Sequence, residues 1–260
     1  MRFELQLNRS TKHRMLPMNY QYYISAWIYR VLFAADRDFA IFLHDHGYGK
    51  SDTKLYKLFC FSKLDFGKPK LWTDKSLFEI AEHEIYLRIS FDVPEAAGNF
   101  IKGLFQNQEF YLGDKFNGID FQVRSVEALP APSIESTMQY HLQTPWVVSF
   151  QPDGAKYSKY LQPDDEDFER LAIKHLCEKY NNTRNTQTMG EDQVNMIRTS
   201  DFKKSGIVLK PGTREESKVI GSLFSFQLTA PLELHQMIFG AGVSEKSSSG
   251  FGWVETVDIK

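Results

Sequence analysis

Residues 240–252 read GAGVSEKSSSGFG and combine glycines, serines and a lysine in a pattern suited to a ligand that carries phosphate. Glycine lets the backbone approach a ligand closely and adopt positive φ, and successive backbone N–H groups can converge on a phosphate. The two Gly-x-Gly pairs are more than a flexible serine-rich hairpin requires. The predicted ligand-binding residues of this segment are Gly240, Gly242, Lys246, Ser247, Gly250 and Gly252.

The register of this segment excludes the common nucleotide-binding loops. A P-loop, GxxxxGK[ST], started at Gly240 would supply Lys246 and Ser247 but would place Glu245 at its last glycine, where a carboxylate would face the phosphates. The dinucleotide fingerprint GxGxxG fails at the same residue. Both loops also open a βαβ unit, and the sequence after Gly252 is too short for one.

A second candidate site is the histidine pair His44 and His46 in FLHDHGY. Histidine titrates near neutral pH and can act as a general acid or base. On their own, the two residues could equally be polar groups at a helix end, where the helix dipole favours a cation. An HxH pair can also hold a metal, but no third ligand stands at a suitable spacing, so we expect no metal site.

Basic residues gather in residues 50–75 and again in residues 203–218, although the formal net charge of the chain is only −2. That balance argues against a uniformly basic surface but leaves room for local patches. The acidic run DDEDFE at residues 164–169 is typical of a solvated helix start. In the second basic stretch the candidate phosphate contacts are Lys203, Lys204, Lys210 and Arg214.

Length and composition indicate a folded protein of one large or two smaller domains. The chain has 260 residues, and two domains of roughly 130 residues each would have ordinary sizes. Cys60 and Cys177 are far apart and in no CxxC motif, so we expect two buried thiols. The N-terminus has no signal-peptide h-region and no run is long enough to span a membrane, so we expect a cytoplasmic protein.

Apolar periodicity predicts the element order β α β β α β in the first half. Alternating residues indicate half-buried strands, and spacings of three and four residues indicate helices. Pro94 suits the first turn of a helix, and Gly47 suits the end of one. The predicted strands are residues 2–7, 57–64, 84–91 and 118–129, and the predicted helices are residues 20–35, 38–47 and 93–105.

The same order recurs after a proline-rich break at residues 129–133. The second half is predicted to contain strands at residues 145–150, 205–210, 220–228 and 250–259, and helices at residues 164–180 and 231–239. The fold class is therefore α+β, with two tandem ferredoxin-like (RRM-like) domains and a C-terminal glycine-rich loop. We place the domains at residues 1–128 and 136–260 and the linker at residues 129–135.

Taken together, these features resemble the CRISPR-associated endoribonucleases of the repeat-associated (RAMP) superfamily, which cut the repeat transcript into guide RNAs. The resemblance rests on MRFELQL, LPMNYQYYISAWIYRVL, FLHDHGY followed by KLFCFSKL, and GAGVSEKSSSGFGWVE. Between about Lys68 and Ile220 only the pattern of elements matches. The resemblance implies two ferredoxin-like domains, a glycine-rich loop that shapes the RNA site, and cleavage of CRISPR repeat RNA without a metal or another cofactor.

By position, His44 resembles the family's general acid or base, and His46 resembles the partner histidine of some relatives. Tyr29 resembles the tyrosine of the first helix, and Lys57 the lysine that begins the second strand. Attack of a ribose 2′-OH on its own phosphorus needs a base, an acid for the leaving 5′-oxygen and a cation for the phosphorane. Histidine can take either proton role, lysine can hold the phosphorane, and tyrosine can orient the 2′-OH or share in proton transfer.

The chain departs from the family pattern at three points, one of which is the second histidine, His46. GYGKSDTKLY, which ends just before Lys57, is longer than the pattern leads one to expect, so Lys50 and Lys54 remain alternatives for the catalytic cation. Ser244 takes the place of the second of two glycines that precede Glu-Lys in the family, so the path of the loop can differ.

The resemblance implies an endoribonuclease that leaves a 5′-hydroxyl and a 2′,3′-cyclic phosphate, and it assigns RNA binding to the glycine-rich segment. Lys203, Lys204, Lys210 and Arg214 are further candidates for RNA phosphate contacts. A non-catalytic RNA-binding RAMP subunit of an effector complex remains an alternative, as does a domain pair for a small phosphorylated ligand. Monomer, homodimer and association with other effector subunits all remain open.

Overall fold

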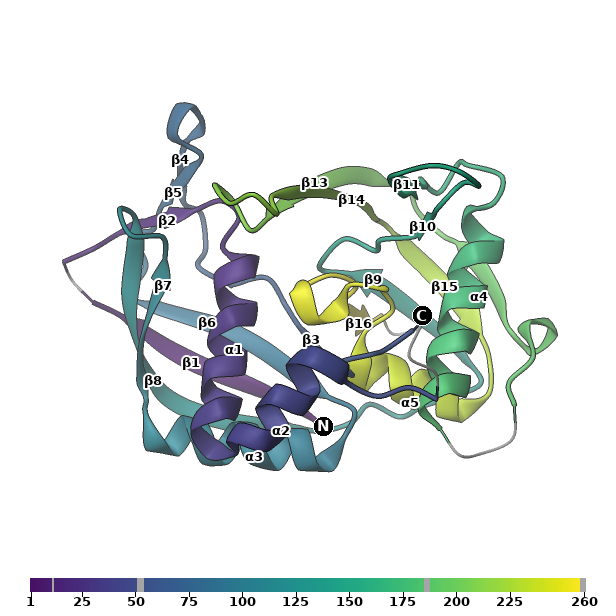
Figure 1. Ribbon diagram of the computed structural model, residues 1–260, viewed down its shortest axis with the longest axis horizontal. Helices are drawn as coiled ribbons and strands as arrows, with labels where there is room; N and C mark the ends of the chain where they lie inside the picture. Colours follow the sequence, from purple (N-terminus) through teal and green to yellow (C-terminus); the bar gives the residue numbers. More distant parts are fainter. Residues whose placement is uncertain (11, 51–53, 185–187, 258–260) are drawn as a thin grey trace.

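The first half of the chain forms a five-stranded antiparallel sheet in the order β3-β6-β1-β8-β7. The computed structural model describes residues 1–10, 12–50, 54–184 and 188–257 (Figure 1). The strands of this sheet are β1 (Arg2–Arg9), β3 (Phe59–Phe61), β6 (Glu84–Phe91), β7 (Glu109–Gly113) and β8 (Gly118–Leu129).

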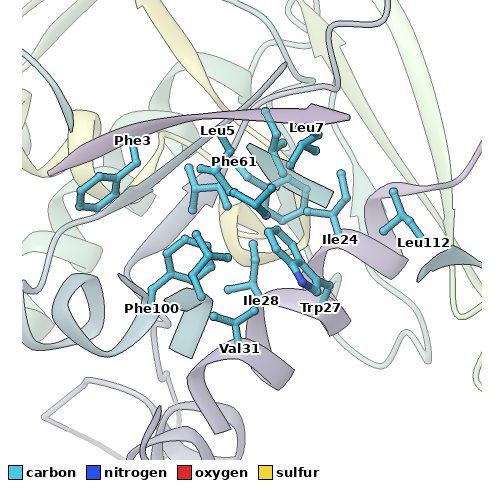
Figure 2. Packing of buried hydrophobic residues seen from close by; sticks show 14 of the residues in the cluster. Phe3, Leu5, Leu7, Ile24, Trp27, Ile28, Val31, Phe61, Phe100 and Leu112 are labelled. Atoms are coloured by element: carbon cyan, nitrogen blue, oxygen red, sulfur yellow. The ribbon is translucent and has the colours of Figure 1, made fainter. Parts of the chain in front are cut away.

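Helices cover one face of this sheet. Alternate residues of β1, Phe3, Leu5 and Leu7, are buried against Ile28 and Phe100 from two of those helices (Figure 2). Burial of alternate side chains is the reason that this segment is a strand with one core face. The helices are α1 (Gln21–Ala35), α2 (Arg37–Ile41), which continues into a π-helical turn (Phe42–His46), and α3 (Pro94–Gln106).

A small three-stranded sheet in the order β2-β5-β4 belongs to the same half of the chain. Its β4–β5 hairpin projects from the rest of the molecule in Figure 1. The strands are β2 (Met15–Pro17), β4 (Lys70–Trp72) and β5 (Leu77–Glu79), with a 3-10 turn (Thr73–Lys75) between the last two.

The second half forms a four-stranded antiparallel sheet in the order β12-β15-β9-β16, packed against two helices. Its strands are β9 (Thr137–Leu142), β12 (Asn195–Arg198), β15 (Ser225–Thr229) and β16 (Val254–Thr256). The helices are α4 (Phe168–Thr183) and α5 (Leu232–Ala241), with 3-10 turns at Glu191–Gln193 and Ser247–Ser249.

Two hairpins lie outside this sheet. The longer one pairs β13 (Lys203–Leu209) with β14 (Ser217–Leu223), and the shorter one pairs β10 (Ser149–Phe150) with β11 (Lys159–Tyr160). The longer hairpin reaches over to the first half, where the backbone N–H of Val208 donates to Asn19 Oδ1 at 3.0 Å. Figure 1 shows it arching from the second half toward the N-terminal end of α1.

The mixed α+β class predicted from the sequence is confirmed, and the first-half strands and helices form close to their predicted positions. In the second half both predicted helices form, but β12 of the main sheet was not predicted, and two predicted strands are wrong. The first strand of the sheet is β9, whereas residues 145–150 supply only a bridge at Trp146 and the short β10. Residues 220–228 were predicted as one strand, but they are divided between β14 and β15 of different sheets. The predicted last strand ends in residues outside the described part of the chain.

Arg2 of β1 joins the two halves. Its guanidinium lies 4.3 Å from the ring centre of Phe239 and 4.2 Å from that of Trp253. It donates to the backbone oxygens of Phe239 and Val254, at 3.0 and 2.9 Å, and pairs with Glu255. The N-terminal strand therefore holds α5 and β16 in place. In the described part of the chain, no helix has both the length and the apolar character needed to cross a bilayer.

Candidate active site

The histidine pair lies on the π-helical turn Phe42–His46, which we call the histidine turn. The backbone N–H of Gly47 donates to Phe42 O at 2.8 Å, which closes the wider ring of a π turn. Gly47 then adopts a φ of 79°, so the chain leaves the helix through a conformation that favours glycine. The side chains of His44 and His46 are both exposed, as a site open to a macromolecule requires.

Asp45 orients the ring of His44. His44 Nδ1 lies 2.8 Å from Asp45 Oδ1, and the hydrogen bond from His44 is the main reason that the pKa of Asp45 is lowered. When Nδ1 donates to this carboxylate, Nε2 is left as the nitrogen that can exchange a proton with a substrate. Asp45 had no role in the sequence prediction, although its place between the two histidines was a visible signal.

Tyr29 of α1 packs directly against His44. The two rings meet edge to face with their centres 5.0 Å apart. Burial raises the pKa of the Tyr29 phenol, and a hydrogen bond with the Ser248 side chain opposes this shift only in part. Tyr29 therefore keeps its proton at neutral pH and can donate a hydrogen bond.

Lys57 ties the histidine turn together from its backbone side. Its ammonium donates to His44 O at 2.6 Å and to His46 O at 3.2 Å. Burial lowers the pKa of this lysine, and the charge of Asp45 counteracts the shift. Lys54, one of its two alternatives, is paired with Glu178 of α4, and Lys50, the other, is exposed. Of these lysines, Lys57 is thus the one joined to the histidine turn.

A cavity of about 240 Å³ adjoins His44 and Tyr29. Its other lining residues include Arg30, Phe33 and Ile41, so a cation and apolar side chains lie next to the two candidate catalytic groups. Phe33 is 49% exposed and offers an aromatic surface on which a base could stack. The cavity has room for part of a nucleotide beside His44.

The glycine-rich loop, residues 240–252, is packed between the two halves. A Cβ at Gly240 would lie 2.6 Å from Asp92 Cα, and a Cβ at Gly250, where φ is 85°, would lie 2.5 Å from the Phe61 ring. These glycines are required by close packing against the first half. Gly242, Ser247 and Gly252 are buried too, whereas Lys246 is partly exposed. RNA binding by these residues stays a prediction.

The tip of the loop contacts the helix that carries Tyr29. Ser25 Oγ of α1 donates to Ser248 O at 2.8 Å, one turn of helix before Tyr29. In Figure 1 the segment that follows α5, coloured yellow, lies between the halves beside α1. The two candidate sites found in the sequence, which are some two hundred residues apart, therefore meet at α1.

The basic candidates of the second half lie on the β13–β14 hairpin. Lys203 and Lys204 begin β13, and Lys210 and Arg214 belong to its turn, and all four side chains are exposed. Lys210 pairs with Glu215 across the turn, which reduces its availability for phosphate. Lys203 and Lys204 are accordingly the better candidates for contact with a polyanion, and this role also stays a prediction.

Lys179 of α4 contacts the glycine-rich loop and was not named by the sequence prediction. It is buried, and its ammonium contacts the glycine-rich loop at Gly242 O, 3.0 Å, and Ser244 O, 2.8 Å. A lysine in an amphipathic helix is ordinarily solvated, so nothing in the sequence signalled its burial. Both cysteines are buried free thiols, as predicted.

In the described residues, neither histidine belongs to a group of three or more His, Cys, Asp or Glu side chains that could hold a metal ion. The functional groups at the site are imidazole, phenol, carboxylate and ammonium. Such a set can move protons and stabilise an anion.

Comparison with protein families gives two matches that together span most of the chain. The model described as CRISPR-associated protein Cas6, N-terminal, matches residues 15–127. The model described as CRISPR associated protein Cas6, C-terminal, matches residues 129–256. The boundary between them falls at the start of the predicted linker.

Individual relatives cover nearly the whole chain. The CRISPR-associated endoribonuclease Cas6 1 of Methanocaldococcus jannaschii is 25% identical over 264 residues, which cover 100% of this chain and 94% of the relative. The CRISPR-associated endoribonuclease Cas6 of Pyrococcus furiosus is 24% identical over 258 residues, covering 98% of this chain and 89% of the relative. A solved structure from work on a Cas6-related gene of Pyrococcus furiosus superposes with a TM-score of 0.82 at 22% identity, and covers 100% of this chain and 99% of the other.

Proposed function

Because the chain belongs to the Cas6 family of CRISPR-associated proteins, we propose that it is an endoribonuclease that cleaves CRISPR repeat RNA. The observation that supports this most directly is that α1 carries both Tyr29, whose ring packs against His44, and Ser25, which donates to Ser248 of the glycine-rich loop. Proton-transfer chemistry from the first half is thereby joined to a glycine-rich loop from the second.

The reaction proposed is attack of a ribose 2′-OH on the adjacent phosphorus, without a metal. Nε2 of His44 either accepts the proton of the 2′-OH or donates one to the departing 5′-oxygen. Tyr29, which keeps its proton, donates a hydrogen bond to the 2′-oxygen or to a phosphoryl oxygen. Lys57 fixes the backbone of the histidine turn, and its charge favours the phosphorane. The products are a 5′-hydroxyl and a 2′,3′-cyclic phosphate, or the 3′-phosphate formed when that ring opens.

We read each half as a ferredoxin-like domain, residues 1–128 and 136–260, joined by the linker 129–135. The support is topological. In the first half β1, β3, β6 and β8 form the order β3-β6-β1-β8, and in the second β9, β12, β15 and β16 form the equivalent order β12-β15-β9-β16. With α1 and α3 in one half, and α4 and α5 in the other, both follow the β α β β α β sequence of that fold.

The RNA would pass from the histidine turn along the loop to the β13–β14 hairpin. Exposed Lys203 and Lys204, partly exposed Lys246 and the turn residues Lys210 and Arg214 would contribute phosphate contacts. The proposed setting is the cytoplasm, where the product guide RNA could be handed to other CRISPR subunits.

The test is incubation of the purified protein with its neighbouring repeat RNA in EDTA, alongside His44→Ala. As a matched control we choose His13→Ala, which removes an exposed histidine of the loop after β1. We expect one cut by the wild type and by His13→Ala, and a loss of about 100-fold or more in rate for His44→Ala. A 2′-deoxy substitution at the cleaved nucleotide should prevent cutting. Cleavage of that substrate would contradict the mechanism, and tight binding without any cut would indicate a non-catalytic RAMP subunit.

A further inference from the structure

The glycine-rich loop is held from behind by a lysine inside the molecule. Lys179 is only 4% exposed, and its ammonium lies within hydrogen-bond distance of Gly242 O, Ser244 O and Ser247 Oγ, the last at 3.4 Å. An ammonium has three donors, and these three acceptors all belong to the loop. The ammonium of Lys179 therefore binds the loop through two carbonyl oxygens and one hydroxyl oxygen.

Burial of this ammonium carries a desolvation cost, which lowers its pKa. Burial lowers the pKa of Lys179 to about 8, against opposing contributions from Cys60, Asp92 and Glu245. An apolar residue of similar size would avoid this desolvation. A buried lysine that costs stability and contacts one loop is better explained by the conformation of that loop than by the stability of the core.

The contacts of Lys179 lead through the loop to the candidate active site. Ser247 Oγ donates to Ser244 O at 2.7 Å, which closes the turn that Lys179 holds. The next residue, Ser248, accepts a hydrogen bond from Ser25 of α1 through its carbonyl, one helical turn before Tyr29. Lys179 contacts this short turn at Ser247, and α1 contacts it at Ser248.

We propose that Lys179 is a positioning residue for RNA cleavage, which fixes the Ser247–Ser249 turn against Ser25 of α1 so that this helix holds Tyr29 beside His44. The inference rests on the proposed function. Lys179 itself, being buried, touches no RNA. Its loss releases the loop from α4 and lets Tyr29 move relative to the reacting phosphate.

The test compares Lys179→Met with Lys179→Arg and with the control Lys174→Met. Lys174 lies on the same helix, where it is 44% exposed at its side chain and faces Glu178. We expect Lys179→Met to lower the single-turnover cleavage rate about 10- to 100-fold with less than about a threefold change in the dissociation constant for RNA. Lys179→Arg should recover part of the rate, and Lys174→Met should stay within about twofold of the wild type.

Hydrogen exchange without RNA gives a readout that does not depend on cleavage. In Lys179→Met, backbone amides of residues 243–250 should exchange faster, while those of β1 and β6 stay as protected as in the wild type. Faster exchange throughout the protein would mean a general loss of stability and would overturn the proposal.

Ser25→Ala provides a second route to the same conclusion should Lys179→Met fold poorly. It removes the hydrogen bond to Ser248 O from the α1 side and leaves the core unchanged. We expect a smaller decrease in rate of the same kind, and the double variant should be less impaired than the product of the two single effects. Independent effects, or cleavage by Lys179→Met at the rate of Lys174→Met, would refute the inference alone. A wild type that binds repeat RNA without cutting it would refute the proposed function instead.

Discussion

At His44 the neighbouring residue decides which ring nitrogen is free to react. Asp45 accepts from Nδ1 and leaves Nε2 for proton transfer. Both groups are exposed, so the pair owes its geometry to the π-helical turn and to Lys57 beneath it. We therefore expect this exposed aspartate to take part in the proposed reaction by orienting the ring of His44.

We expect Asp45→Asn to lower the single-turnover rate of repeat cleavage by roughly 10-fold or more. The reason is that a neutral amide cannot stabilise the positive charge of a protonated His44 ring as a carboxylate does. RNA affinity should stay close to that of the wild type. Asp38→Asn, which alters an exposed acid in α2, is the control. Equal rates for Asp45→Asn and the wild type would show that the carboxylate does not orient the ring.

From the sequence, Tyr29 and His44 could be named together because their order along the chain matches a family pattern, and the structure places their rings in contact. Their catalytic roles stay a prediction. The sequence was not sufficient to predict Lys179. The burial of Lys179 depends on carbonyl oxygens more than sixty residues further along the chain, a contact that no local periodicity encodes. Ser248 was missed for a related reason, since a cluster of serines does not reveal which one contacts α1.

The glycine-rich loop is closely packed against the first half of the chain. A Cβ at its glycines would clash with Asp92, Phe61, Cys60 or other atoms of the loop. The loop can therefore bring Ser248 to α1 only if these positions remain glycine.

Gly250→Ala should destabilise the protein by about 1–3 kcal/mol more than Gly154→Ala, as measured by denaturant unfolding. The two glycines have similar φ values, 85° and 74°, so the strain from positive φ is common to both. A Cβ at Gly154 would meet nothing within 4 Å, whereas one at Gly250 would lie 2.5 Å from the Phe61 ring. The same free-energy change in both variants would mean that the loop does not press on the first half.

We expect the basic residues of the β13–β14 hairpin to increase RNA affinity and to take no part in the cleavage step. Replacing Lys203 and Lys204 by alanine should weaken RNA binding and reduce the slope of log affinity against log salt by about 1.4 to 1.8, while the cleavage rate at saturation changes little. Lys102 and Lys115, exposed on α3 and after β7, provide a matched double substitution. An unchanged salt dependence would remove the hairpin from the RNA path.

Strands were predictable where alternation is long, as in β6 and β8, and not where burial has another cause. Trp146, Val147 and Val148 look like a core strand but are buried under the β13–β14 hairpin and in the core of the second half. The true strand β9 carries the alternation Met138, Tyr140, Leu142, which the more apolar run overshadowed. At Phe224 the chain passes from one sheet to another, and hydrophobicity does not change there.

At the scale of the molecule, the candidate active site exists only because the two halves are docked. Arg2 fixes this arrangement through aromatic stacking and backbone hydrogen bonds, and burial lowers its pKa to about 10 without removing its charge at neutral pH. A second pair, Arg184 with Asp92, joins α4 to the end of β6.

Arg2→Met should cost about 3–5 kcal/mol of stability, since it leaves buried acceptors on α5 and β16 without their partner. We also expect thermal unfolding to separate into two transitions as the halves uncouple. Arg124→Met, at an exposed position of β8, is the control. A single transition at an unchanged temperature would mean that other contacts suffice to hold the halves together.

The order of these parts along the chain also governs when the protein can act. During synthesis Tyr29 and His44 leave the ribosome long before Ser248, and the first sheet can form while its partner is still being translated. Until the loop is made, α1 lacks the hydrogen bond that joins its Ser25 to Ser248. A nascent chain would therefore carry its histidine past nearby RNA in a form that is not yet competent to cut it.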